Sequence, residues 1–190
     1  MDIETFVKQS IGQWRSQRTA HHLTFRHSEE VHSTIDIEWV DPSDPAVVKL
    51  CELYEVGPTD IISPFRMTWE GESDWDEDEE ERQSMAGTTV LLPVPDPSDP
   101  RKGRLLRDQG YAENVAAAGL YHFTDDGTFV LLTAYNRAAA EERIWFVNPN
   151  LRFRVSMIKT SEGTGVLTAS FASETRSQLH TDDSALTNTN

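Results

Sequence analysis

Short runs in which apolar and polar residues alternate recur along most of the chain, and this period of two is the signature of strands with one buried face. In the first such run, Leu23 and Phe25 alternate with Thr24 and Arg26. Breaks rich in Gly, Pro, Asn and Asp separate the runs. We therefore predict strands over residues 19–27, 34–40, 61–70, 84–93, 104–107, 120–124, 128–135, 142–147, 151–159 and 166–173.

Two segments carry helical signals instead. Phe6, Val7, Ile11 and Trp14 recur at roughly helical spacing, which predicts a helix over residues 2–14. A second, short helix is predicted over residues 44–56, where an apolar run follows a proline. Many short antiparallel strands behind an N-terminal helix leave an open sheet, a sandwich or a closed barrel as candidate folds. A barrel of about eight strands can hold one small ligand in its interior.

The charge balance restricts the partners of such a fold. The chain of 190 residues carries 17 Lys and Arg against 32 Asp and Glu, a formal charge of −15, which argues against non-specific binding of nucleic acid or anionic lipid. Its single cysteine excludes an internal disulfide framework and a zinc-binding cysteine cluster. Charged residues interrupt the first twenty positions, and no run of eighteen apolar residues occurs. We expect a soluble, cytoplasmic protein without a membrane insertion.

Three segments differ in composition from the rest of the chain. Residues 70–82 hold nine acidic residues and one basic residue, which predicts a solvated loop. Four prolines and two aspartates predict a second loop over residues 93–103. Residues 174–190 are rich in Ser, Thr, Asn and Asp, which predicts a disordered tail. A single domain over residues 1–173 remains.

The hairpin predicted across Asn148–Asn150 gathers the most informative side chains. A three-residue loop would pair Val147 with Leu151 and would place Glu142, Arg152, Arg154 and Ser156 on one face of the sheet. The opposite face is nearly all apolar. The polar face is either an ordinary solvated surface with an ion pair or the wall of a pocket. In a pocket, guanidinium groups suit carboxylates, and a glutamate can accept hydrogen bonds from N–H groups.

Other candidate residues have simpler alternative interpretations. Successive strand residues point to opposite faces, so His21 and His22 cannot chelate one metal ion together, and we predict no metal site. Met67, Trp69 and Trp75 form either an apolar pocket wall or part of the core. Cys51 lies in the apolar run of the second helix, which indicates a small hydrophobic residue and not a nucleophile.

Several motifs, in order along the chain, resemble one known family. They are the opening residues 2–14, Ser16-Gln17-Arg18-Thr19-Ala20-His21-His22-Leu23, Met67-Thr68-Trp69-Glu70-Gly71, Glu142-Arg143-Ile144-Trp145-Phe146 and Asn150-Leu151-Arg152-Phe153-Arg154. Together these motifs resemble the S-type phycobiliprotein lyases, the CpcS/CpeS-like chromophore lyases that attach linear tetrapyrroles to light-harvesting proteins. The resemblance covers residues 1 to about 173 and leaves out the acidic expansion and the tail.

The resemblance implies a lipocalin-like antiparallel β-barrel with an N-terminal helix and one further short helix. It implies a lyase that binds a phycobilin, such as phycocyanobilin, as its substrate and uses no cofactor of its own. The acceptor would be a cysteine of an apo-phycobiliprotein subunit, and the location would be the cyanobacterial cytosol or the plastid stroma. It also implies that the chain can act as a homodimer or as a heterodimer with a paralogue. A non-enzymatic bilin carrier with the same fold is the alternative.

Carried over to this sequence, the resemblance assigns roles to individual residues. Glu142 would face the pyrrole N–H groups and could donate a proton. Arg152 and Arg154 would bind the propionates beside Ser156. The remaining bilin-binding residues would be Arg18 and His21 near the opening and the apolar wall of Met67, Trp69 and Trp75. Because Arg18 and His21 differ in parity, they would share a site only if Arg18 precedes the regular strand.

Overall fold

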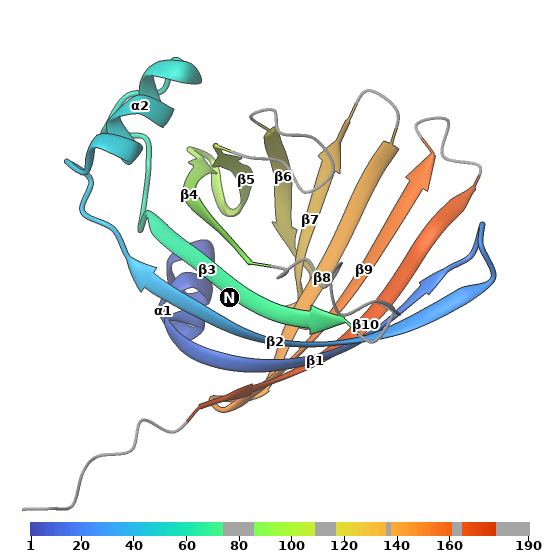
Figure 1. Cartoon of the computed structure of the whole chain (residues 1–190). Helices are drawn as coiled ribbons and strands as arrows, with labels where there is room; N and C mark the ends of the chain where they lie inside the picture. Colours follow the sequence, from blue (N-terminus) through green and yellow to red (C-terminus); the bar gives the residue numbers. More distant parts are fainter. Residues whose placement is uncertain (74–85, 109–116, 136–137, 161–164, 178–190) are drawn as a thin grey trace, which may run out of the picture.

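The computed structural model describes residues 1–73, 86–108, 117–135, 138–160 and 165–177. Its helices and strands are α1 (Ile3–Ser10), β1 (Gly12–His22), β2 (His27–Trp39), α2 (Pro45–Leu53), β3 (Phe65–Ser73), β4 (Gly87–Asp96), β5 (Asp99–Arg107), β6 (Ala117–Phe123), β7 (Phe129–Ala134), β8 (Ala138–Asn148), β9 (Leu151–Thr160) and β10 (Val166–Arg176). All strands are antiparallel to their neighbours, and β1 pairs with both β2 and β10, which closes the sheet into a barrel (Figure 1). The predicted barrel with two helices is confirmed.

Helix α1 is shorter than predicted. Asp2 caps its first turn, since the carboxylate accepts a hydrogen bond from the Thr5 N–H at 2.9 Å. The helix ends at Ser10, and Gly12 with a φ of +118° begins β1, so the predicted helical residues 11–14 are wrong. Glycine permits this backbone conformation, which allows the chain to turn sharply from the helix into the first strand.

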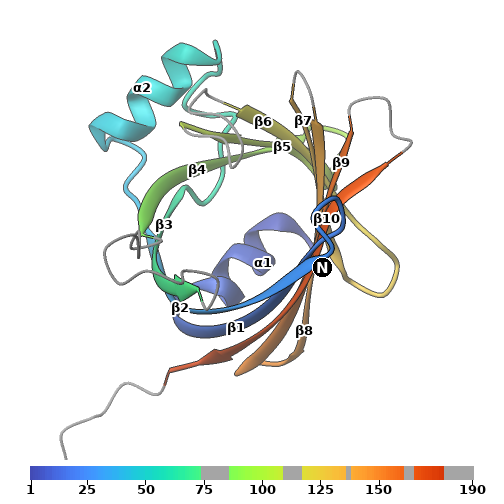
Figure 2. The same ribbon diagram turned by 45° about the vertical axis from the view of Figure 1, so that its right-hand side comes forward.

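The apolar face of α1 enters the barrel and becomes part of its core. Ile3, Phe6 and Val7 are buried in one cluster with residues of the barrel wall. Phe6 stacks on Phe129 of β7 with ring centroids 4.3 Å apart. Figure 2 shows the helix lying across the barrel interior. One end of the lumen is therefore filled by α1.

Helix α2 lies outside the barrel. Its buried residues Val47, Leu50 and Cys51 belong to a second apolar cluster with Leu92 of β4 and Leu106 of β5. Consequently β4 is buried on both faces, against the lumen on one side and against α2 on the other. Within the described residues, neither helix is long and apolar enough to cross a membrane.

The predicted loop over residues 93–103 is wrong, because β4 and β5 extend through most of it. The backbone carbonyl of Pro93 accepts a hydrogen bond from the Ile62 N–H at 3.0 Å. The missing N–H of Pro93 would lie on the same side of β4 as this carbonyl, so it would face the segment before β3. The β3 ladder ends at Leu91, and Pro95 has the same parity as Pro93. Both prolines therefore occupy positions from which no N–H is needed for strand pairing.

The strand predicted over residues 19–27 is wrong, because residues 23–26 form the turn between β1 and β2. Leu23 and Phe25, which suggested a buried strand face, are exposed in this turn.

Other predicted boundaries also need correction. Strand β3 continues to Ser73, so residues 70–73 of the predicted acidic loop are strand, and the rest of that loop from residue 74 lies outside the described residues. Strand β10 continues to Arg176, so the tail predicted from residue 174 begins too early. Hydrogen bonds from the Arg176 guanidinium to the backbone carbonyls of Gln9, Ile11 and Pro149 hold this end of the strand.

The predicted β8–β9 hairpin is confirmed except at its turn. Glu142 pairs with Ser156, and Phe146 pairs with Arg152, as expected. Leu151, however, pairs with Asn148 and not with Val147, because the register shifts between Phe146 and Asn148. The Asn148 side chain accepts from the Asn150 N–H at 2.8 Å, which closes a tighter turn than the three-residue loop.

Candidate functional site

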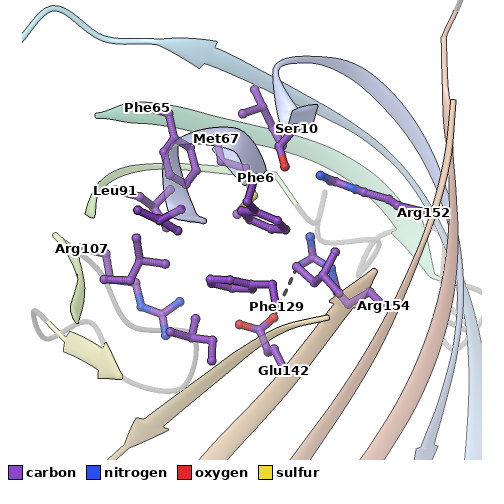
Figure 3. A pocket seen from close by; sticks show the side chains of 15 residues that line it. Phe6, Ser10, Phe65, Met67, Leu91, Arg107, Phe129, Glu142, Arg152 and Arg154 are labelled. Carbon is purple, nitrogen blue, oxygen red and sulfur yellow. Dashed lines mark hydrogen bonds and ion pairs between the residues drawn. The ribbon is translucent and has the colours of Figure 1, made fainter. Parts of the chain in front are cut away.

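A pocket lies within the barrel lumen beside α1, and the space inside it, open solvent included, is about 550 Å³ (Figure 3). Its lining is mostly apolar with a few polar groups: Ile3, Phe6, Ser10, Ile37, Phe65, Met67, Leu91, Leu105, Arg107, Phe129, Leu131, Glu142, Ile144, Arg152 and Arg154. The combination is suited to a largely apolar ligand with a few hydrogen-bonding groups.

The polar side of the pocket is a chain of ion pairs across β8, β9 and β10. Arg154 bridges two carboxylates, since its Nη1 lies 3.3 Å from Oε1 of Glu142 and its Nε lies 3.1 Å from Oε1 of Glu174. Arg152 donates from Nε to Oε2 of the same Glu174. The polar face predicted for the hairpin is therefore a pocket wall and not a solvated surface.

Burial affects the charges of this cluster in opposite ways. Burial by itself would raise the pKa of Glu174, but the guanidinium groups of Arg154 and Arg152 outweigh it and hold the pKa below its usual value. Burial lowers the pKa of Arg152 to about 10, with Glu174 opposing the change. Both side chains are 1% exposed. At neutral pH both therefore remain charged and act as a buried pair.

The apolar wall lies on the opposite side of the lumen. Met67 and Phe65 line the pocket from β3, and Trp69 on the same inward face packs against the core cluster. Trp69 lies opposite Gly87 of β4, where a Cβ atom would come within 2.3 Å of the indole ring. The glycine thus makes the space that the indole occupies. Trp75 lies outside the described residues.

A second polar cluster lies on the inward faces of β1, β2 and β3. Glu29 is its centre: it receives a hydrogen bond from Ser73 Oγ at 2.7 Å, its Oε1 lies 3.1 Å from His22 Nε2, and Arg18 Nη2 lies at 4.0 Å. Arg18 pairs across strands with Ala172, which is also the partner of Arg154 on the other side. The small Ala172 side chain thus separates two inward-facing guanidinium groups.

His21 and Ser156 are placed differently from the residues just described. Arg18 and His22 face inward on β1, so the intervening His21 is on the outer face and is exposed. The expectation that His21 joins Arg18 in the pocket is wrong, because both belong to one regular strand with opposite parity. Ser156 lies directly opposite Glu142 on β9 and is half-buried.

Three polar residues of the site were not foreseen from the sequence. Glu174 fell in the predicted tail. Arg107 of β5 lines the pocket and donates from Nη2 to Thr133 Oγ1 at 3.0 Å. Ser10 continues the buried stripe of α1 that Ile3 begins, seven residues earlier, and this spacing would have located it. Among the described residues, no cluster of three His, Cys, Asp or Glu side chains could hold a metal ion.

The arrangement can bind an extended conjugated ligand between an apolar wall and a line of paired charges. A carboxylate of the ligand could replace Glu142 as a partner of Arg154, and an N–H group of the ligand could replace Arg154 as the partner of Glu142. Neither of these two charges would then be left unpaired on binding. The cysteine of the chain is not an activated nucleophile of this site, because burial raises the pKa of the Cys51 thiol and the residue lies in α2 outside the barrel.

Comparison with known proteins agrees with this geometry. Residues 2–177 match the family model described as CpeS-like protein. The chain belongs to the CpeS-like family. The resemblance to S-type lyases is therefore confirmed, and the match extends past residue 173 to Ser177, just beyond the end of β10.

Other members of the CpeS-like family are similar over nearly the whole chain. Chromophore lyase CpcS/CpeS 3 of Trichodesmium erythraeum is 58% identical, covering 93% of this chain and all of the relative. Putative phycoerythrobilin lyase CpeS of Microchaete diplosiphon is 57% identical, covering 85% of this chain and 71% of the relative. The solved structure of S-type phycobiliprotein lyase CPES from Guillardia theta superimposes with a TM-score of 0.81 at 46% identity, covering 94% of each chain. The lipocalin-like fold is thus that of a solved S-type lyase.

Proposed function

We propose that this chain is a chromophore lyase that holds a phycobilin in its barrel lumen and promotes its thioether attachment to a cysteine of an apo-phycobiliprotein subunit. The single observation that supports this most is the pocket wall in which Arg154 joins Glu142 and Glu174 opposite the apolar residues Met67 and Phe65. The lyase names of the relatives favour an enzyme over a carrier of the same fold.

The bilin matches the lumen group by group. Its propionates can accept from Arg154 and from Arg18, which flank Ala172. Its pyrrole N–H groups can donate to the Glu142 carboxylate, which then no longer needs Arg154 as its partner. Its flat conjugated body can pack on Met67 and Trp69. We expect Trp75 to extend this wall and Ser156 to contact the ligand beside Glu142.

Arg152 has a different role from the propionate contact expected from the sequence. It is 1% exposed, and its charge is paired with Glu174. Binding a propionate there would place a second carboxylate beside the buried Glu174 carboxylate, which already balances the charge of the guanidinium. We therefore assign the propionates to Arg154 and Arg18, which are more exposed.

The reaction itself needs few protein groups. The acceptor thiolate adds to the ethylidene group of the terminal ring A: a C–S bond forms, the C=C π bond breaks, and the bilin takes up one proton. No oxidant or reductant is required. The lyase contributes by holding the bilin extended, shielding it from water and presenting ring A at the mouth, with Glu142 as a pyrrole partner or proton donor.

The decisive experiment is transfer in vitro. Purified protein is mixed with phycocyanobilin and an apo-phycobiliprotein subunit, and covalent product is measured by zinc-induced fluorescence on a denaturing gel. A lyase raises the rate and yield above the spontaneous adduct, and Glu142→Gln lowers the rate. A rate equal to the spontaneous reaction would indicate a carrier and would contradict the proposal.

We also propose that the protein works in the cytosol of a cyanobacterium or in a plastid stroma, and as a homodimer or with a paralogue. The outer face of β8–β10 supports association, because Trp145, Phe153 and Phe171 form an aromatic row there with centroid separations of 5.7 and 5.3 Å. Phe171 is 47% exposed. Size-exclusion chromatography of the wild type and of Phe171→Ser tests this: the variant is expected to shift toward the monomer.

A further inference from the structure

Ser10, the last residue of α1, carries a buried hydroxyl group inside the pocket. The residue is 3% exposed and lines the pocket. Its Oγ atom has no hydrogen-bond partner among the described residues. A buried hydroxyl without a partner is costly, and a bound water, ion or ligand can supply the partner.

Arg152 carries a second donor of this kind. Its Nε donates to Glu174, but Nη2 is buried and also has no hydrogen-bond partner within the described part of the chain. Arg152 lines the same pocket as Ser10. The unpaired side of its guanidinium group is therefore buried at the wall of this pocket.

Trp14 contacts both Ser10 and Arg152. Its indole Nε1–H donates to the backbone carbonyl of Ser10 at 2.8 Å, and the Arg152 guanidinium carbon lies 4.3 Å from the centre of the same indole. Trp14 is fully buried, so both contacts are fixed by packing. In Figure 3 the Ser10 hydroxyl and the Arg152 guanidinium point toward one another at the end of the pocket formed by α1.

The charge around this pair indicates which kind of group it can bind. The two guanidinium groups of Arg152 and Arg154 are balanced by the carboxylates of Glu142 and Glu174. A carboxylate bound beside Ser10 would face the buried Glu174 carboxylate that already pairs with Arg152, and this repulsion is unfavourable. A neutral group with one acceptor and one donor satisfies both side chains, since a hydroxyl can accept or donate.

We propose that Ser10 and Arg152 form a deep subsite for an uncharged lactam, one terminal ring of a linear tetrapyrrole. The lactam carbonyl accepts from Arg152 Nη2, and the adjacent lactam N–H donates to Ser10 Oγ. This inference rests on the proposed function and adds the direction of binding. One terminal ring lies against α1, and the opposite terminal ring lies toward the Arg18 and Glu29 cluster.

The test is an absorbance titration of Ser10→Ala and wild type with phycocyanobilin and with its dimethyl ester, which keeps the lactams and lacks the propionate charges. Ser10→Ala is expected to weaken binding of both compounds by the same factor, about fivefold to tenfold. Ser10→Thr, which keeps the hydroxyl, is expected to restore most of the affinity. Ser16→Ala is the matched control, since Ser16 is buried on β1 and does not line the pocket.

The possible results separate the two proposals. Wild-type affinity in Ser10→Ala would overturn the subsite while the lyase proposal stands. A loss confined to the free acid would also overturn it, because the subsite would then bind a propionate. Failure of the wild type to bind either compound would instead contradict the proposed function. The melting temperature of ligand-free Ser10→Ala is expected to be at least that of the wild type, since the buried hydroxyl has no partner to lose and leaving it unpaired is costly.

Discussion

Arg152 and Glu174 form an ion pair in which each side chain is 1% exposed, and this pair joins strands β9 and β10 inside the barrel. Arg154 binds the same carboxylate at 3.1 Å. One glutamate thus holds two guanidinium groups in place. The geometry of the polar pocket wall therefore depends on Glu174, which itself does not line the pocket.

Replacing Glu174 by Gln is expected to destabilise the protein strongly, because two buried guanidinium groups lose their shared counter-charge. Breaking one side of a buried pair typically costs about 3–5 kcal/mol. Urea unfolding followed by tryptophan fluorescence measures the loss. Glu38→Gln is the control: Glu38 pairs with Arg66 at 3.2 Å but is 65% exposed, so the expected cost is at most ~1 kcal/mol. Equal losses in both variants would contradict the role of Glu174.

Protonation of the Glu174 carboxylate is expected to lower the stability of the folded protein in acid. The folded-state pKa of Glu174 is held below its ordinary value of 4.5, so the unfolded state binds the proton more readily. The stabilisation is present above pH 4.5 and is lost as the pH falls through the lower folded-state value. Urea unfolding of the wild type and of Glu174→Gln between pH ~6 and ~3 should therefore show their difference shrinking on acidification. A constant difference would rule out this linkage.

Glu142→Gln is expected to weaken phycocyanobilin binding roughly tenfold, since a charge-assisted hydrogen bond to the pyrroles becomes a neutral one. The neighbouring Glu141 offers a matched control. It is ion-paired to Arg143 at 2.8 Å and to Lys159 at 3.1 Å, but it has the opposite parity on β8. Absorbance titrations should show unchanged affinity for Glu141→Gln. Equal effects of the two variants would mean that Glu142 does not face the ligand.

Gly87→Ala tests the apolar wall. The added Cβ would lie 2.3 Å from the Trp69 ring, so the indole must move, and overpacking of this kind costs about 1–3 kcal/mol. We expect weaker bilin binding and an altered tryptophan emission spectrum. In Gly165→Ala the nearest atom, Thr160 Cγ2, is 3.6 Å away, an ordinary contact. That variant should bind the bilin like the wild type.

Cys51→Ser is expected to leave chromophore transfer intact. The thiol is buried in α2 against β4 and β5, outside the lumen, and burial raises its pKa. It is therefore neither ionised nor accessible to the bilin. The gel assay for covalent product measures transfer. Loss of transfer in a folded Cys51→Ser protein would show that the lyase forms its own adduct.

The pocket wall illustrates how far the sequence alone could reach. The alternation of residues along β8 and β9 placed Glu142, Arg154 and Ser156 on one face correctly, because strand parity is a local property. The same rule gives Arg18 and His21 opposite parity, although the family resemblance assigns both of them to the bilin site. The turn at Asn148 was predicted one residue too long, since a local shift in register leaves no clear trace in the hydrophobic pattern.

The sequence by itself determined the parity of most strands, the two helices and the family, because these depend on local periodicity and on motifs. Tertiary structure alone decided which face of each strand points inward and that α1 fills one end of the barrel. It also decided that Glu174, from a segment resembling a tail, becomes the partner of Arg152 and Arg154. Burial and pairing between distant strands arise only when the sheet closes, so the residue pattern of one short segment does not reveal them.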